Sequence, residues 1–548
     1  MYTKLNGREI RARRGDTWLR LLEKLPEGER NALGISIAGK THSLTDKAEE
    51  YAYATTLTLK DEEGRRIYER SVQFLLLTAV QRIYPWARIR IQHSLGRGVY
   101  MEAENLELAG ENIAAIRGEM DKLVEQDLPI RRYEVSTRDA ANYFLRTNQT
   151  DRLRILGYRK VEHFTLYEID GLQDYFYGVM VPSTGYTPVY DVVPYARGMV
   201  LLMPSEEDPA RASRFRDYPK LTQVYAETAQ WHGILHCRNV ADLNDMIRDH
   251  RLREFIRVNE ALHEKKIQWI ADQAIDSGAR VLLISGPSSS GKTTFAHRLS
   301  IALRVHGLRP VKLSLDDYYR NRDELPLEED GTVDLERLDT LDTRLLCEHL
   351  PKLLRGEEVE VPTFDFKTGR RTEQGHIMRV EEGQPIIIEG IHGLNEALTA
   401  SVPRNLKFKI YISALTMLNL DDHNRIRATD ARLLRRIVRD NLFRGTPPEE
   451  TMGMWASVRR GEVNYIYPFE EDADVMFNSA LSYELPIMKK YAYPHLLAIQ
   501  PESPYYTMAR RLVKFLNYIQ TADVEDEVPV NSILREFIGG CCFYREED

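Results

Sequence analysis

Cysteine is scarce in this chain, which has four among its 548 residues. Cys541 and Cys542 are adjacent, a spacing poorly suited to a disulfide, while Cys237 and Cys347 stand alone. The composition therefore argues against a disulfide-stabilised secreted framework and fits a reducing cytoplasm.

Long apolar runs and an excess of positive charge are also lacking. No apolar run approaches the length that crosses a membrane, and the first ten residues contain no apolar signal core. We therefore expect a cytoplasmic protein without a membrane partner. The net charge of −8 provides no overall basic surface for nucleic acid, so RNA is a partner that the composition does not support.

The stretch from residue 281 to residue 304 carries the clearest chemistry. An apolar run typical of a buried strand precedes the spacing G-x-x-x-x-G-K-[ST], and a segment with helical periodicity follows it. Glycines in such a loop let backbone N–H groups point into a nest of phosphate size, and the helix adds its positive N-terminal end. Lys292 would bind the β- and γ-phosphates, and Thr293 suits a magnesium ion. The predicted ATP-binding residues are Gly286, Pro287, Ser288, Ser289, Ser290, Gly291, Lys292, Thr293 and Thr294.

Carboxylates follow two further strands that the pattern predicts. Residues 310–315 lead into Asp316 and Asp317, and the apolar run 384–388 leads into Glu389. Because the ends of parallel strands converge on the ligand, Asp316 is our candidate for the base that accepts a hydroxyl proton, with Asp317 as the alternative. Glu389 would join Thr293 in holding magnesium.

An arginine-rich helix is predicted over residues 430–440. Its arginines recur at three- and four-residue spacings, with apolar residues between them as anchors. Such a helix is usually a solvated face, but here we interpret it as a lid that clamps the transferring phosphate. Arg435 and Arg436 would act with Lys292 and Asp316 in catalysis, and Arg444 with Gly445 would form a hinge.

These segments together resemble the uridine kinase/phosphoribulokinase family of P-loop kinases. The matching stretches, in the order of that family, are residues 286–294, 313–320, 362–366, 389–390 and 432–440. The resemblance implies that Asp316 is the general base and that Thr293 and Glu389 hold magnesium. It also implies an acceptor site that includes Tyr319, Phe364, Arg371 and Arg432.

Two departures concern the acceptor. Uridine kinases place a base-contacting histidine shortly after their Tyr-Asp-Phe segment, where Gly369 stands in this chain. Their Asp-His-Pro segment, whose aspartate holds the ribose, is replaced by residues 336–339, in which Glu336 is the candidate for the same role. The resemblance therefore implies ATP as the phosphoryl donor and leaves the acceptor open.

The first 200 residues resemble another family, the N-terminal half of threonyl-tRNA synthetases, in which a TGS domain precedes an editing-type domain. The resemblance rests on residues 127–131, Asp174, Gly178 and residues 181–185 in matching order. That editing domain carries an H-x-x-x-H pair and a later cysteine and histidine. The corresponding positions here are Arg70, Phe74, Phe176 and Met180. None of these can bind a metal or relay a proton as the family's residues do, so we expect a lost active site closed by apolar side chains.

The predicted fold is α/β with four parts. They are a small β-grasp-like TGS domain (1–65), an α+β synthetase-editing-like domain with its active site lost (66–205), a helical connector (206–278), and a P-loop kinase fold with a parallel sheet, an arginine lid and C-terminal helices (279–548). No Gly/Ser-rich linker separates them, so we expect packed domains.

The predicted activity is ATP- and magnesium-dependent phosphoryl transfer to the hydroxyl of a small acceptor, first of all the 5′-hydroxyl of uridine or cytidine. The alternatives are another nucleoside or a phosphorylated sugar as acceptor. A further alternative, from a different class, is an RNA-associated regulatory protein in which bound nucleotide acts as a switch. The sequence leaves the oligomeric state and the role of the N-terminal half open.

Overall fold

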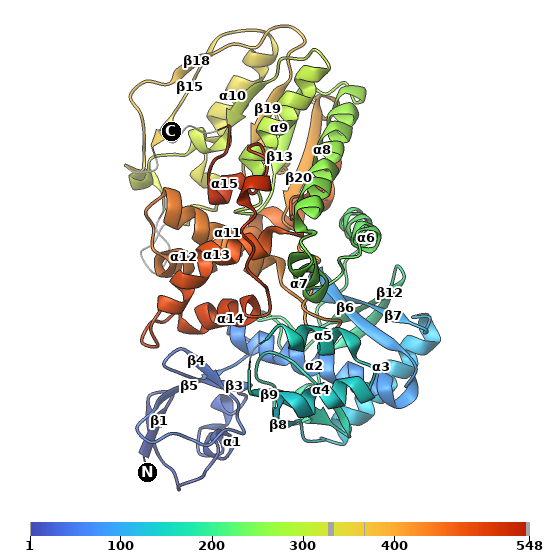
Figure 1. Ribbon diagram of the computed structural model, residues 1–548. Helices are drawn as coiled ribbons and strands as arrows, with labels where there is room; N and C mark the ends of the chain where they lie inside the picture. Colours follow the sequence, from blue (N-terminus) through green and yellow to red (C-terminus); the bar gives the residue numbers. More distant parts are fainter. Residues whose placement is uncertain (1, 160, 327–333, 366–367, 544–548) are drawn as a thin grey trace.

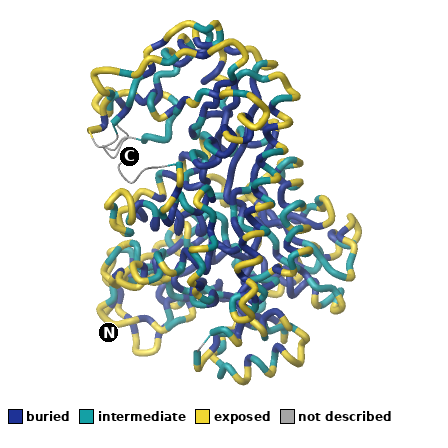
Figure 2. Tube along the Cα trace, turned by 45° about the horizontal axis from the view of Figure 1, so that its top comes forward, coloured by how far each residue is buried: buried dark blue, intermediate teal, exposed yellow. Residues whose placement is uncertain are grey.

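The computed structural model describes residues 2–159, 161–326, 334–365 and 368–543. The first 200 residues form one end of the molecule and the second half of the chain forms the other (Figure 1). Buried residues continue through the middle between these two parts (Figure 2), and one hydrophobic core contains side chains from both. No helix among the described residues is long and apolar enough to span a membrane.

The chain begins with a small mixed sheet whose strand order is β2-β1-β5-β3-β4. Only the β1–β5 pair is parallel; the other neighbours are antiparallel. Asn6 and Gly7 both have positive φ, as a two-residue hairpin turn between β1 and β2 requires. Helix α1 (Trp18–Leu22) buries Trp18 and Leu21 against this sheet. The strands are β1 (Tyr2–Leu5), β2 (Arg8–Arg11), β3 (Gly34–Ile37), β4 (Lys40–His42) and β5 (Tyr53–Leu57).

A long helix, α2 (Glu62–Ile83), forms the centre of the next region. Its second half is largely apolar, whereas its first turns carry charged residues such as Arg66, which is buried in an ion pair. A four-stranded antiparallel sheet of order β11-β12-β7-β6 and a three-stranded sheet of order β10-β9-β8 complete the region. Its remaining elements are β6 (Arg88–Leu95), β7 (Gly98–Glu104), α3 (Gly110–Glu125), β8 (Arg131–Ser136), α4 (Thr137–Arg146), α5 (Thr150–Gly157), β9 (His163–Ile169), β10 (Leu172–Asp174), β11 (Asp191–Tyr195) and β12 (Gly198–Leu202).

The segment expected to connect the halves is helical: α6 (Pro219–Ile234), α7 (Val240–Arg248) and α8 (Leu252–Asp276). Helix α8 is more than a connector. Ile267 and Ile270 of α8 lie in the same core as Phe295 and Ile284 of the second half, so α8 is one of the helices that cover the parallel sheet there (Figure 1).

The second half is built on a five-stranded, all-parallel sheet of order β14-β19-β13-β20-β21. Alternate residues of its central strand face two layers: Leu282 and Ile284 share a core with α8 and α9, whereas Val281 and Leu283 share a core with α10. The strands are β13 (Val281–Ser285), β14 (Val311–Ser314), β19 (Ile386–Glu389), β20 (Lys407–Ser413) and β21 (Val475–Asn478). The helices are α9 (Lys292–Val305), α10 (Thr343–Leu354), α11 (Ala428–Phe443), α12 (Pro448–Gly461), α13 (Glu484–Ala498), α14 (Tyr506–Leu516) and α15 (Arg535–Ile538).

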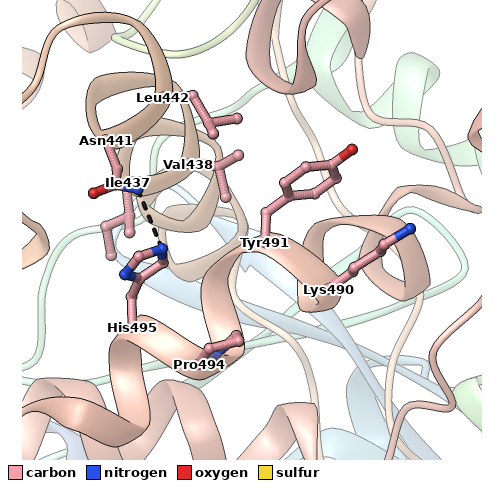
Figure 3. Close-up of a pocket in the computed structure, with 8 residues that line it drawn as sticks. All are labelled: Ile437, Val438, Asn441, Leu442, Lys490, Tyr491, Pro494 and His495. Carbon is pink, nitrogen blue, oxygen red and sulfur yellow. Dashed lines mark hydrogen bonds between the residues drawn. The ribbon is translucent and has the colours of Figure 1, made fainter.

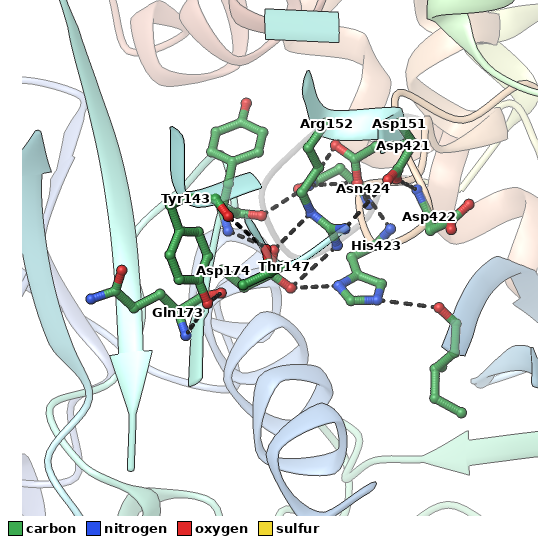
Figure 4. Close-up of polar contacts among 12 residues, drawn as sticks. Tyr143, Thr147, Asp151, Arg152, Gln173, Asp174, Asp421, Asp422, His423 and Asn424 are labelled. Carbon is green, nitrogen blue, oxygen red and sulfur yellow. Dashed lines mark hydrogen bonds and ion pairs between the residues drawn. The ribbon is translucent and has the colours of Figure 1, made fainter. Parts of the chain in front are cut away.

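A loop between β20 and α11 ties the second half to the first (Figure 4). The His423 ring contacts the Asp174 carboxylate through Nδ1 and the Ile89 carbonyl through Nε2 at 3.2 Å. Arg152 lies between Asp174 and Asp151, and the Asp151 carboxylate accepts a hydrogen bond from the Asp422 N–H at 2.9 Å. Each charge in this buried cluster has an opposite charge beside it, which offsets the cost of removing it from water.

Candidate active site

The phosphate-binding loop connects the central strand β13 to helix α9. A Cβ at Gly286 would lie 1.9 Å from the Ile412 carbonyl oxygen, so only glycine fits where the loop leaves the strand. Gly291 has a φ of 87° and Ser289 one of 60°, which turn successive N–H groups toward one side. The strand, loop and helix that the spacing predicted are confirmed.

Lys292, the first residue of α9, reaches back across this loop. Its Nζ donates to the carbonyl oxygens of Gly286 at 3.0 Å and Pro287 at 3.2 Å. The ammonium is thereby held at the mouth of the loop, next to the first helical turn, whose N–H groups have no partner within the helix. Thr293, the predicted magnesium ligand, follows in the same turn. A triphosphate entering the loop would meet both the ammonium and the N-terminal end of the helix.

Asp316 and Glu389 come together because their strands are neighbours. Ser314 of β14 is paired in register with Glu389 of β19, and the Ser314 hydroxyl donates to the Glu389 carboxylate at 3.4 Å. Asp316 follows in the turn after β14. Burial raises the pKa of Glu389 to about 7; Asp316 adds to the rise and Lys292 opposes it. The two carboxylates and the Lys292 ammonium therefore act on one another at the end of the sheet.

The surroundings of the two candidate bases differ. Asp316 is open to solvent on one side but stands among many protein atoms, and this desolvation raises its pKa. Lys292 and Arg444 oppose the rise and Asp317 reinforces it. Burial also raises the pKa of Asp317, but there the group that lowers the pKa is His376. Asp316, not Asp317, thus faces the loop lysine.

Three of the predicted acceptor residues line one side of the cleft. The rings of Tyr319 and Phe364 lie 5.5 Å apart, with Phe364 supplied by strand β16 (Phe364–Asp365). Burial, together with Glu462, raises the pKa of Glu336 to about 7, while Arg436 and Lys292 oppose the rise, so Glu336 is within electrostatic reach of the loop lysine. Phe366, the last residue of the matching segment 362–366, lies outside the described residues.

Arg371 contacts the backbone of the segment that follows β14. Its Nε donates to the Tyr319 carbonyl at 2.8 Å and its Nη2 to the Tyr318 carbonyl at 3.0 Å, while Nη1 lies 3.3 Å from the Asp342 carboxylate. Its guanidinium is thus used to brace the backbone that carries Asp316 and Tyr319. The prediction that Arg371 also contacts the acceptor stays a prediction.

Helix α11 is a fixed part of the core, which corrects the prediction of an arginine lid. Arg432 is 1% exposed and Arg435 is fully buried, and their guanidinium groups pair with Glu462 and Glu484 respectively. Arg432 also donates to the Ser288 carbonyl at 2.9 Å. The carboxylate partners stand 30 and 49 residues further along the chain, so spacing within the helix could not reveal them. Arg432 and Arg435 thus donate to backbone carbonyls of the phosphate loop and hold it against the core.

Arg436 contacts a side chain of the loop, whereas Arg432 and Arg435 contact backbone carbonyls of the loop. Its Nη1 donates to the Ser288 hydroxyl at 2.9 Å, and burial lowers its pKa. The opposite side of α11 faces α13 instead of the phosphate loop. There Ile437, Val438 and Asn441 line a cavity of about 190 Å³ together with residues of α13 (Figure 3). Asn441 donates to the His495 ring in that cavity at 3.2 Å.

Two residues of the cleft escaped the sequence analysis. Arg444, expected only as a hinge, lowers the pKa of Asp316 and is therefore a cation of the cleft. Glu536 of α15 accepts a hydrogen bond from the Thr294 hydroxyl at 2.7 Å. The series of arginines that runs from Arg432 to Arg444 could have indicated Arg444. Nothing in the sequence around residue 536 could have indicated the second.

Comparison with known proteins covers the region that contains this cleft. Residues 281–485 match the Phosphoribulokinase / Uridine kinase family. A uridine kinase of Chloroflexus aurantiacus is 31% identical over 198 residues, 36% of this chain and 85% of that protein. A uridine kinase of Bacillus pumilus is 30% identical over 197 residues, 36% of this chain and 84% of that protein.

Solved structures match part of this chain with low TM-scores. A protein described as a possible uridine kinase from Bacillus stearothermophilus has 20% identity and a TM-score of 0.27, covering 39% of this chain and 98% of its own. A D-glycerate 3-kinase from Cryptococcus neoformans has 16% identity and a TM-score of 0.20, covering 51% of this chain and 89% of its own.

Proposed function

Because this chain belongs to the phosphoribulokinase/uridine kinase family and is thus an ATP-dependent kinase, we propose that it phosphorylates the 5′-hydroxyl of a pyrimidine nucleoside, uridine or cytidine. The observation that carries the proposal is the meeting of Lys292, Asp316 and Glu389 at the ends of three adjacent parallel strands. This geometry provides a cation for the phosphates and a carboxylate for the acceptor in one cleft.

In the proposed reaction the acceptor hydroxyl oxygen forms a bond to the γ-phosphorus as the bond from that phosphorus to the bridging oxygen breaks. Asp316 accepts the hydroxyl proton, and its raised pKa brings it nearer to the working pH of a general base. The loop N–H groups and Lys292 hold the phosphates in line. Arg436 and Arg444 add positive charge beside the transferring group.

The residues fit a magnesium ion at Thr293 and Glu389. The pKa of Glu389 is raised to about 7 first by burial and then by Asp316, which indicates a concentration of negative charge that a divalent cation would relieve. When bound, the cation would neutralise charge on the transferring phosphoryl group. Hard oxygen donors such as this hydroxyl and this carboxylate are the ligands that magnesium prefers.

The acceptor side supports a nucleoside through Tyr319, Phe364 and Glu336. The two rings offer an apolar surface on which a base can stack, and Glu336 offers a carboxylate to ribose hydroxyls. At position 369, where uridine kinases carry a histidine, an added Cβ would lie 2.5 Å from the Arg322 side chain. Arg322 therefore takes the space next to that position.

A second acceptor class, a phosphorylated sugar, is favoured by one observation. A polar cavity of about 420 Å³ adjoins the segment after Tyr319. Three arginines line it, which would suit an anionic group. Its lining residues are Arg320, Asn321, Glu324, Asp342, Arg344 and Arg371.

For the N-terminal half we propose a TGS-like domain over residues 1–65 and an editing-like domain over residues 66–205 whose active site is lost. Phe74, Phe176 and Met180 are each at most 2% exposed, and the two rings lie 5.4 Å apart. The Arg70 guanidinium donates to the Val179 carbonyl at 3.0 Å. These contacts support a closed apolar core at the positions where the editing family keeps its catalytic side chains.

The test is product formation from ATP and magnesium across a panel of nucleosides and phosphorylated sugars, with Lys292→Ala as the blank. We expect fast phosphorylation of uridine or cytidine. Turnover of a phosphorylated sugar alone would move the acceptor to the arginine-lined cavity. No turnover on the panel, combined with a salt-sensitive gel shift of tRNA, would instead favour the RNA-associated regulatory protein.

A further inference from the structure

The last part of the chain, residues 529–543, returns to the phosphate loop. It lies beyond residue 485, where the family match ends, so it is an addition to the shared kinase region. Its path is held by buried contacts: the Ser532 hydroxyl donates to Glu260 of α8 at 2.6 Å, and Ile533 and Phe537 are fully buried. Helix α15 stands beside α11 in Figure 1. The segment is therefore a docked element of the fold.

Glu536 in this segment contacts the donors of the phosphate loop. Its Oε2 accepts from the Thr294 hydroxyl at 2.7 Å and from the Thr294 N–H at 3.4 Å. This N–H belongs to the first turn of α9, whose amides have no partner within the helix and provide an anion-binding end. A carboxylate thus occupies donors that a P-loop offers to phosphate oxygens.

Ile533 closes the loop from the same side. A Cβ at Gly291 would lie 2.4 Å from the Cγ2 of Ile533, so this side chain packs directly on the glycine that precedes Lys292. Further along, the Phe537 ring lies 5.0 Å from the Arg435 guanidinium, and the Phe543 ring stacks on His297 of α9 with centroids 4.9 Å apart. The segment therefore spans from α11 to α9 across the loop.

Charge makes this contact incompatible with a bound triphosphate. The Glu536 carboxylate already places a negative charge on the N–H and the hydroxyl of Thr294. A triphosphate would add several more negative charges and would compete for the Thr294 N–H. The carboxylate and the phosphate cannot share this donor.

We propose that residues 529–543 form an autoinhibitory plug in which Glu536 occupies the phosphate-binding donors of Thr294 and must leave before ATP binds. The proposal rests on the ATP site assigned above to the loop 286–294. Nucleotide affinity is then reduced by the fraction of molecules in which the plug is docked, and any event that releases the segment increases activity.

The first test measures equilibrium binding of ATP with magnesium to the full-length protein, without acceptor. The variants are Glu536→Gln, which keeps the shape and removes the charge, and Glu502→Gln, which makes the same charge change at an exposed glutamate in the turn after α13. We expect Glu536→Gln to bind ATP roughly ten-fold more tightly, as the loss of a charge-assisted contact permits. Glu502→Gln should bind as the parent does.

Unchanged ATP binding by Glu536→Gln would overturn the proposal, because Glu536 would then have no effect on nucleotide affinity. Weaker binding would also overturn it, because Glu536 would then contribute to the nucleotide site. Failure of every variant to bind ATP, with Lys292→Ala indistinguishable from the parent, would overturn the ATP site itself. A second readout is amide hydrogen exchange of residues 532–538. We expect ATP to increase exchange there, and protection by ATP would contradict the proposal.

Discussion

The kinase half of this molecule gathers charged side chains at the ends of its parallel strands, whereas the N-terminal half packs apolar side chains at the positions that we propose as a lost editing site. In the kinase half, Lys292, Asp316 and Glu389 keep charges in a desolvated place, and the pKa of Glu389 rises to about 7 as a result. In the N-terminal half, the proposed counterpart is filled by Phe74, Phe176 and Met180. Charges without full compensation reduce stability and persist where chemistry needs them, whereas apolar side chains at such positions increase it. The difference supports the proposal that the kinase cluster carries out phosphoryl transfer and that the N-terminal cluster has a structural role.

The largest expected effect tests the kinase cluster. Asp316→Asn should lower kcat by about 10²–10⁴-fold while changing ATP affinity by less than about three-fold, because the amide cannot accept the acceptor's proton but keeps the shape. Steady-state kinetics and equilibrium ATP binding provide the measurement. Asp317→Asn is the matched control, since it makes the same change one residue away beside His376. A larger loss in Asp317→Asn than in Asp316→Asn would reverse the assignment of the base.

Part of the kinase site could be predicted from the sequence alone. The loop 286–294 and the carboxylates Asp316 and Glu389 were predictable, since each follows an apolar strand and parallel strands bring their ends together. The arginine helix was predicted as a helix but given the wrong role. Its partners Glu462 and Glu484 come from other helices, and a buried ion pair depends on tertiary contacts that spacing does not encode.

Other parts of the site could not have been predicted at all. Glu536 reaches Thr294 across 242 residues of sequence, and the four-residue helix that carries it has no motif of its own. Arg371 has the residue type of a substrate contact, yet its hydrogen bonds go to backbone carbonyls. In both cases the residue type was visible, while the contact that decides its role is set only when distant segments pack.

The next effect tests the apolar core of the N-terminal half. Phe176→Ala should reduce the free energy of unfolding by about 3–5 kcal/mol, because it leaves a cavity beside Phe74 in a closed core. Denaturant titration gives the stability, and kcat measured well below the unfolding transition should stay within about two-fold of the parent. The control is Leu145→Ala, at a side chain that is 65% exposed. A variant that folds normally but loses most of its kcat would break the division of roles between the two halves.

The smallest effect concerns a charge packed against the N-terminal half, where Nζ of Lys514 in α14 lies 5.8 Å from the centroid of the Tyr177 ring. Burial, helped by Arg159, Arg70 and Arg132, lowers the pKa of Lys514 to about 7. The unfolded chain keeps this lysine protonated up to about pH 10.4, so the folded state bears the full cost of the charge below pH 7. That cost fades as the pH rises from 7 toward 10.

Lys514→Met should therefore stabilise the protein by about 1–2 kcal/mol at pH 6, after allowance for solvent screening, and by less at pH 9. Thermal unfolding at the two pH values measures the difference, with Lys265→Met, at an exposed position of α8, as the control. A gain that is equal at both pH values would show that added apolar packing, not charge, is responsible. A loss of stability at pH 6 would mean that the ammonium has a favourable partner. The N-terminal half would then contain a stabilising buried charge, and its contrast with the kinase half would be weaker.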